Sequence, residues 1–142
     1  MKKLIFAFVI LFLPVAVHAD ETDVLKALEK IKGNVEAGVI LKKYQELIVD
    51  AKVEINMFKR EAKGKENFLK AAESCLAYYS LAKISWRVKN DMSKINNAEG
   101  RRLEGESKAA VQDSWKKAEV QLDNAYAACK KIGSVELRRP GQ

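Results

Sequence analysis

The feature that most constrains this chain is the absence of proline from Asp20 to Arg139, a stretch in which glycine is also rare. Proline and glycine are the residues that most strongly interrupt helices. The same stretch is rich in Ala, Lys, Glu and Leu, which favour helices, and it nowhere sustains the polar–apolar alternation of a strand. The sequence therefore predicts an all-α protein.

Apolar residues recur at alternating spacings of three and four, as expected for helices that bury one face. The pattern predicts one short helix and three longer ones, over 22–37, 41–62, 66–96 and 106–133. A break near Gly38 separates the first two, although one long helix with a local shift in register is an alternative. A tight turn is predicted at Gly64, and a longer polar connection is predicted over 96–106, which contains Gly100 and Gly105.

These helices predict an elongated antiparallel helical bundle, made of three long helices and a shorter N-terminal one. The predicted domain spans 20–133, and 134–142 is expected to form a flexible C-terminal tail. Three long helices alone bury only a modest core. Either the first helix completes a four-helix bundle, or the remaining apolar face meets a partner or a second copy of the chain.

Residues 1–19 have the pattern of a secretory signal peptide. Lys2 and Lys3 precede an apolar stretch of 14 residues, and Val17 and Ala19 stand three and one residues before the expected cut. That stretch is shorter than the about 20 residues that span a bilayer, so an uncleaved anchor is the weaker alternative. We expect cleavage after Ala19, export to the periplasm or the exterior, and no transmembrane segment in the mature chain.

The two cysteines, Cys75 and Cys129, both fall on the apolar faces of their predicted helices. If the last two helices form a hairpin that turns in the middle of 96–106, the cysteines lie at the same level. Disulfides are common in exported proteins, so the sequence predicts a Cys75–Cys129 disulfide that staples the hairpin. Two buried thiols are the alternative.

Without residues 1–19 the chain contains no histidine, because His18 is the only one. Histidine is the usual general base near neutral pH and the commonest metal ligand. Its absence excludes Ser-His-Asp and Cys-His catalysis and His-ligated metal or haem sites. We therefore predict no catalytic, cofactor-binding or metal-binding residue. Asp50 and Glu54, one helical turn apart, are the nearest pair for an enzyme that uses only carboxylates and lysines.

Charge gives only mild guidance about partners. Without Lys2 and Lys3 the net charge falls from +7 to +5, and the two signs are interleaved along the chain. Such a charge favours at most a weak contact with an anionic envelope surface, and export argues against a nucleic-acid partner.

Five residues form the candidate interaction surface: Tyr78, Trp86, Arg101, Arg102 and Trp115. Tyr78 lies off the apolar face, the two tryptophans fall near one end of the predicted hairpin, and the arginines fall in its predicted loop. The alternatives to an interaction surface are that the aromatic residues pack in the core and that the arginines are solvated surface charges.

By elimination, the sequence predicts an exported, non-enzymatic protein that binds or scaffolds another protein, or a second copy of itself, in the cell envelope. The alternative function is a carrier of a small apolar ligand or lipid, held in the bundle near Trp86 and Trp115.

Overall fold

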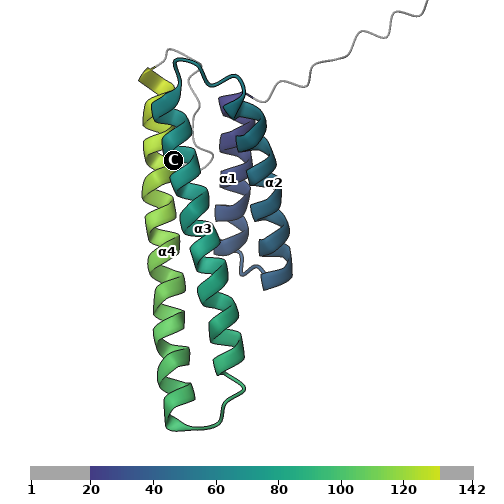
Figure 1. The fold of residues 1–142 in the computed structure, drawn as a ribbon, viewed down its shortest axis with the longest axis vertical. Coiled ribbons are helices and arrows are strands. Elements are labelled where there is room, and N and C mark those ends of the chain that lie inside the picture. The colour runs from purple at the N-terminus through teal and green to yellow at the C-terminus, as the bar shows by residue number, and fades with distance from the viewer. Residues whose placement is uncertain (1–19, 132–142) are drawn as a thin grey trace, which may run out of the picture.

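The computed structural model describes residues 20–131, which form four α-helices and no strand (Figure 1). The helices are α1 (Glu21–Glu36), α2 (Leu41–Lys59), α3 (Glu66–Met92) and α4 (Ala98–Lys131). This confirms the predicted all-α class. The predicted signal peptide and C-terminal tail lie outside the described residues. Within 20–131, no helix is both long enough and apolar enough to cross a membrane.

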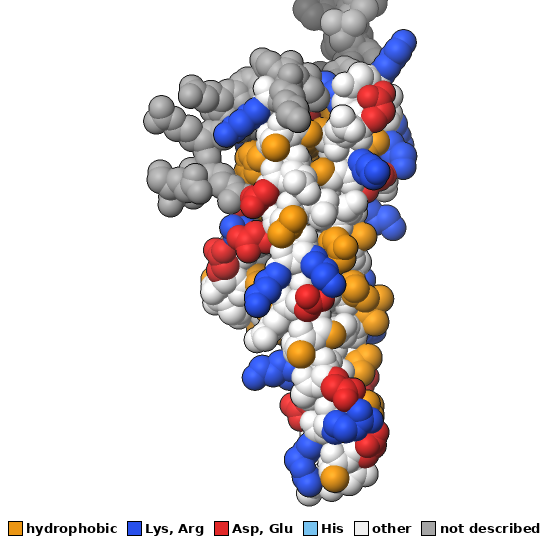
Figure 2. Space-filling view, turned by 90° about the vertical axis from the view of Figure 1, so that its left-hand side faces the viewer, with side chains coloured by type: hydrophobic (Ala, Val, Ile, Leu, Met, Phe, Trp, Pro, Cys, Tyr) orange, Lys and Arg blue, Asp and Glu red, His pale blue; other side chains and the backbone are white. Residues whose placement is uncertain are grey.

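The four helices differ in length, and this difference shapes the molecule. α1 and α2 have 16 and 19 residues, whereas α3 and α4 have 27 and 34. The bundle therefore has two short and two long helices, instead of one short and three long. At one end the four helices lie side by side, and beyond α1 and α2 the hairpin of α3 and α4 continues alone (Figure 1). The molecule accordingly narrows toward the hairpin tip (Figure 2).

Local sequence explains where the first three helices begin and end. The Asp20 side chain accepts a hydrogen bond from the backbone N–H of Asp23 at 3.0 Å, and the Asp23 carboxylate faces the backbone N–H of Asp20, which makes a capping box. Gly38 has φ +83°, so the chain breaks between α1 and α2 as predicted. Gly64 has φ +80° in the predicted turn before α3. α2 ends at Lys59, which is three residues before the predicted end of that helix.

The connection between α3 and α4 is shorter and earlier than predicted: it spans 93–97 instead of 96–106. Asn97 precedes the first residue of α4, and its side-chain oxygen accepts a hydrogen bond from the backbone N–H of Gly100 at 2.7 Å. Gly100 itself packs against Ile95, where an added Cβ would stand 2.5 Å from the Ile95 carbonyl oxygen. This glycine therefore permits a close approach inside the first turn of α4 and does not interrupt the helix.

The earlier turn removes the basis for the predicted Cys75–Cys129 disulfide, and that prediction was wrong. Both residues are buried thiols, and no disulfide joins them in the described chain. Ala128, the neighbour of Cys129, shares a small surface cavity with Asn67 and Ala71, near the start of α3. Cys129 is therefore displaced from the level of Cys75 by about eight residues, or roughly 12 Å of helix.

The core fills the four-helix end of the molecule. Its largest fully buried side chains come from all four helices and include Leu28, Tyr44, Phe58, Phe68 and Leu122. Fully burying an aliphatic or aromatic side chain of this size stabilises the fold by about 1.5–3 kcal/mol. α1 packs against the other three helices, so the short first helix completes the four-helix core.

Candidate functional site

Four aromatic side chains meet where the first turn of α2 packs against the middle of the hairpin. Tyr44 lies 5.7 Å from Trp86 and 6.2 Å from Trp115, measured between ring centroids. The two tryptophans lie 5.7 Å apart and edge to face, and Tyr79 makes a further edge contact with Tyr44 at 6.4 Å. Contacts of this kind add about 0.5–1.5 kcal/mol per pair beyond the area that they bury.

The hydroxyl of Tyr44 organises this cluster. Tyr44 is completely buried, donates to the backbone carbonyl of Tyr79 at 2.9 Å and accepts from Trp115 Nε1 at 3.0 Å. Burial raises the pKa of Tyr44 well above its ordinary value, so the hydroxyl stays protonated and keeps its donor. The bonds link α2 to both α3 and α4 and fix the orientation of the Trp115 indole.

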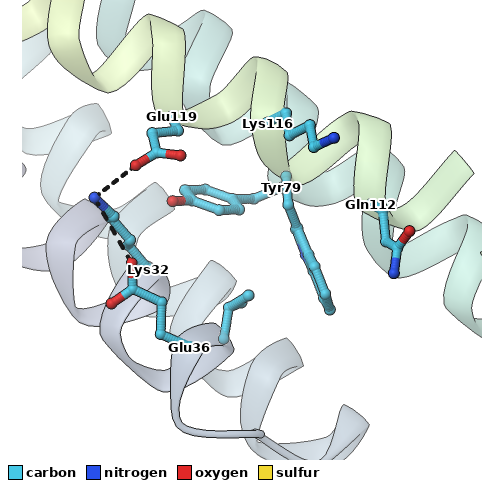
Figure 3. A pocket seen from close by; sticks show the side chains of 8 residues that line it. Lys32, Glu36, Tyr79, Gln112, Lys116 and Glu119 are labelled. Carbon is cyan, nitrogen blue, oxygen red and sulfur yellow. Dashed lines mark ion pairs between the residues drawn. The ribbon is translucent and has the colours of Figure 1, made fainter. Parts of the chain in front are cut away.

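Two open cavities adjoin at Trp115, and we call them together the tryptophan groove. The larger has a volume of about 450 Å³ and is lined by α1, α3 and α4 (Figure 3); its residues are Lys32, Val35, Glu36, Tyr79, Gln112, Trp115, Lys116 and Glu119. The smaller, of about 180 Å³, lies toward the hairpin tip and is lined by Trp86, Lys89, Lys108, Val111, Gln112 and Trp115. Both tryptophans are only partly buried, so their rings contribute to the floor of the groove.

Charge is distributed unevenly along the groove. At the α1 end, Lys32 Nζ lies 2.7 Å from a carboxylate oxygen of Glu119 and 3.7 Å from one of Glu36 (Figure 3). This ion pair ties α1 to α4. Toward the tip, Lys89 and Lys108 form no ion pair with any residue of the described chain, and Lys116 on the α4 side forms none either. The groove thus combines an apolar floor with a basic rim.

The structure brings together only part of the predicted interaction surface. Trp86 and Trp115 are in contact, whereas Tyr78 is half-buried on α3 and does not line the groove. Arg101 and Arg102 lie in the first turns of α4, about 20 Å along that helix from Trp115. Arg102 is held by ion pairs with its own helix, to Glu99 and Glu106.

Several residues of the aromatic cluster and of the groove were missed from sequence alone. Tyr44 fell on the apolar face of α2, and a tyrosine hydroxyl at a buried position needs a hydrogen-bond partner, which was a usable signal. The lysines Lys89, Lys108 and Lys116 could be placed around the tryptophans only with the correct hairpin turn. An error of several residues in the position of that turn places these lysines at levels of the hairpin away from the tryptophans.

Comparisons with known proteins add no relative: no protein-family model, no curated protein and no solved structure matches the chain. Among residues 20–131, no group of three or more His, Cys, Asp or Glu side chains is placed to hold a metal ion.

Proposed function

We propose that this protein is an exported, non-enzymatic binding protein of the cell envelope, which engages a helical segment of another protein through the tryptophan groove. The observation that supports this most is the level at which the four-helix bundle narrows to the two helices of the hairpin. We call this level the step. α1 ends and α2 begins beside Trp86 and Trp115, and beyond this level the hairpin of α3 and α4 continues without α1 and α2 (Figure 1).

A partner helix seated in this step would continue the four-helix cross-section. It would bury the exposed parts of Trp86 and Trp115, as an amphipathic helix does in a hydrophobic groove. Tryptophan is among the residue types enriched at the interface positions that dominate binding energy. Lys89 and Lys108, which form no ion pair within residues 20–131, would favour acidic residues along the edges of that helix.

A second candidate function is the carriage of a small apolar ligand. The larger cavity of the groove, about 450 Å³, falls in the size range of small-molecule sites, and Val35, Tyr79 and Trp115 give it apolar walls. A ligand held there would contact the Trp115 ring directly, so binding would shift tryptophan fluorescence. A flat titration with an apolar dye or a lipid would count against this candidate.

Site-specific photo-crosslinking in the native host would test the protein-binding proposal. A photoreactive side chain at Gln112, which lines both cavities, should capture a discrete partner band. The matched control is the same side chain at Asn56, which is exposed on α2 and remote from the groove. The Lys89→Glu/Lys108→Glu variant should weaken capture at Gln112. Identical bands at both positions, or none at Gln112, would reject the proposal.

Native mass spectrometry of the protein recovered gently from its host's exported fraction separates the remaining alternatives. A mass matching cleavage after Ala19 supports export. A bound protein or a second copy supports the binding proposal, whereas a bound small mass supports the carrier. Recovery of the chain only from the unexported fraction would contradict the proposed location.

A further inference from the structure

The larger cavity of the tryptophan groove contains a buried hydrogen-bond donor, the Tyr79 hydroxyl. Tyr79 lines this cavity and is only 2 % exposed. Its hydroxyl points toward the side of the cavity where Lys32 pairs with Glu119, but it forms no hydrogen bond with any described residue (Figure 3). Buried hydroxyl groups in folded proteins are nearly always hydrogen-bonded, so this one requires a partner from outside residues 20–131.

The neighbouring tyrosine shows how the same fold treats a hydroxyl that needs no such partner. Tyr44 is completely buried, and its hydroxyl bonds to the Tyr79 carbonyl and to Trp115 Nε1. The bond to the carbonyl and the edge contact between the two tyrosine rings hold Tyr79 in place. The Tyr79 hydroxyl is therefore positioned by the core, while its own donor stays available to the cavity.

The state of the Tyr79 hydroxyl restricts what it can contact. Burial raises its pKa well above the usual value for tyrosine, and nearby ionisable groups, among them Glu29 and Glu119, raise it further. The hydroxyl is thus protonated at neutral pH, and a group that accepts its proton in a hydrogen bond completes it. The same carboxylates repel a further negative charge beside the hydroxyl, so a neutral acceptor fits better than an anionic one.

The charges on the cavity wall also favour an uncharged ligand. Two lysines and two glutamates line the cavity, so their formal charges cancel. Lys32 lies between both carboxylates, 2.7 Å from Glu119 and 3.7 Å from Glu36. Lys116 forms no ion pair with described residues, but it is exposed at the rim. A charged ligand would therefore lose its hydration inside the cavity without meeting an uncompensated charge there.

We propose that the larger cavity binds a small uncharged ligand with an apolar body and one acceptor oxygen, such as the carbonyl of a ketone or ester, which accepts a hydrogen bond from the Tyr79 hydroxyl. The apolar body packs against Val35 and the Trp115 ring, in a volume of about 450 Å³ that falls in the range of small-molecule sites. This inference rests on the second candidate function, the carriage of an apolar ligand, and adds the class of ligand and the residue that selects it.

The dye Prodan, an uncharged naphthyl ketone, tests the proposal, because its emission reports both apolar surroundings and hydrogen bonds to its carbonyl. The protein from the exported fraction should bind it saturably. Tyr79→Phe should weaken binding about three- to tenfold and move the emission of the bound dye to shorter wavelength, because the carbonyl loses its donor. Tyr78→Phe, at the next residue of α3 and outside the groove, should change neither. Equal affinity and emission for Tyr79→Phe and the unmodified protein would overturn the proposal.

The stability of Tyr79→Phe without ligand supplies a second readout. The lost hydroxyl bonds to no described residue, so the free energy of unfolding in urea should match that of the unmodified protein. A clear loss of stability would show that the hydroxyl already has a partner within the protein, which would overturn the proposal.

Competition against Prodan tests the class of ligand. Methyl naphthyl ketone should displace the dye at lower concentration than isopropylnaphthalene, which has a similar shape but no acceptor oxygen. It should also displace the dye at lower concentration than naphthoate, which carries a negative charge. Stronger displacement by the hydrocarbon or by naphthoate would overturn the assignment of an uncharged acceptor.

Paired variants locate the binding site. Val35→Phe fills the larger cavity and should remove most of the binding, whereas Val53→Phe, on the exposed face of α2, should keep it. Equal losses in the two variants would overturn the assignment to this cavity. Binding that is lost in Val35→Phe but unchanged in Tyr79→Phe would support the carrier function and overturn this inference alone. The absence of saturable binding to the unmodified protein would overturn both, and photo-crosslinking at Gln112 tests the protein-binding proposal separately.

Discussion

At the scale of single residues, the tyrosine hydroxyl at the centre of the aromatic cluster connects three helices. Tyr44 donates to the Tyr79 carbonyl and accepts from Trp115 Nε1. Such a buried hydroxyl stabilises the fold mainly because its removal would leave the carbonyl and the indole N–H without this hydrogen-bond partner. The fold around the groove therefore depends on a polar atom that the apolar pattern of α2 does not reveal.

Replacing Tyr44 with Phe should lower the free energy of unfolding by about 1–3 kcal/mol, because Trp115 Nε1 loses its acceptor and no water replaces the buried hydroxyl. Urea unfolding followed by circular dichroism measures the change, and tryptophan emission should shift as the indole reorients. Tyr78→Phe is the matched control, since the Tyr78 hydroxyl makes no hydrogen bond within residues 20–131. Equal stability of the two variants would contradict the bridging role.

Stability should also fall in alkaline solution. Burial raises the pKa of the Cys75 thiol from 9.0 to about 12 and that of Tyr126 to about 12, and it raises the pKa of Tyr44 and Tyr79 further. The unfolded chain loses these protons from about pH 9, while the folded chain retains them. The unfolded state then binds fewer protons, so the free energy of unfolding decreases as the pH rises from about 9 toward 12.

Thermal melts at pH 8, 10 and 11.5 check this expectation, and the melting temperature should drop progressively above pH 9. Cys75→Ala should make the drop shallower between pH 9 and 10, because one of the titrating groups is gone. A melting temperature that is constant up to pH 11.5 would show that these side chains are not buried as described.

At the scale of helices, sequence patterns predicted most of the elements but misplaced one turn. The break at Gly38 and the turn at Gly64 were predictable because both glycines occupy a left-handed conformation that other residues avoid. Gly100 and Gly105 were interpreted in the same way, although both lie within α4. A glycine in the sequence does not by itself show whether it ends a helix or lies within one and lets another residue approach closely.

The two misread glycines make a matched pair for a stability measurement. Gly105→Ala meets nothing within 4 Å, so it should stabilise the protein by about 0.5–1 kcal/mol through helix propensity. Gly100→Ala should instead destabilise it by about 1–3 kcal/mol, because the new Cβ would stand 2.5 Å from the Ile95 carbonyl oxygen and 2.8 Å from Ile95 Cβ. Urea unfolding of both variants gives the signs; a stabilising Gly100→Ala would mean that the connection over 93–97 packs differently.

At the scale of the whole molecule, an elongated helical bundle could be predicted, but the step in it could not. The step lies at the turn between α1 and α2, which was predicted, but the length of the hairpin beyond it depends on where the hairpin turns. The connection between α3 and α4 spans 93–97 and was predicted over 96–106. Trp86 and Trp115 were expected near each other because both lie close to the hairpin end. The basic rim of the groove and its contact with α1 depend on the register between the helices. The apolar pattern within each helix does not determine that register.

The step predicts a gradient of local stability along the hairpin. Near the tip, at 87–92 and 98–108, the two long helices of the described chain pack against each other, whereas 68–82 and 116–129 belong to the four-helix core (Figure 1). Segments with fewer buried apolar contacts open at lower free energy, so amide hydrogens near the tip should exchange faster by at least about tenfold. Hydrogen-exchange mass spectrometry on peptides from both ends of α3 measures the ratio. Uniform protection along α3 and α4 would show that another molecule covers the tip in solution, and added partner should move the free protein toward that uniform pattern.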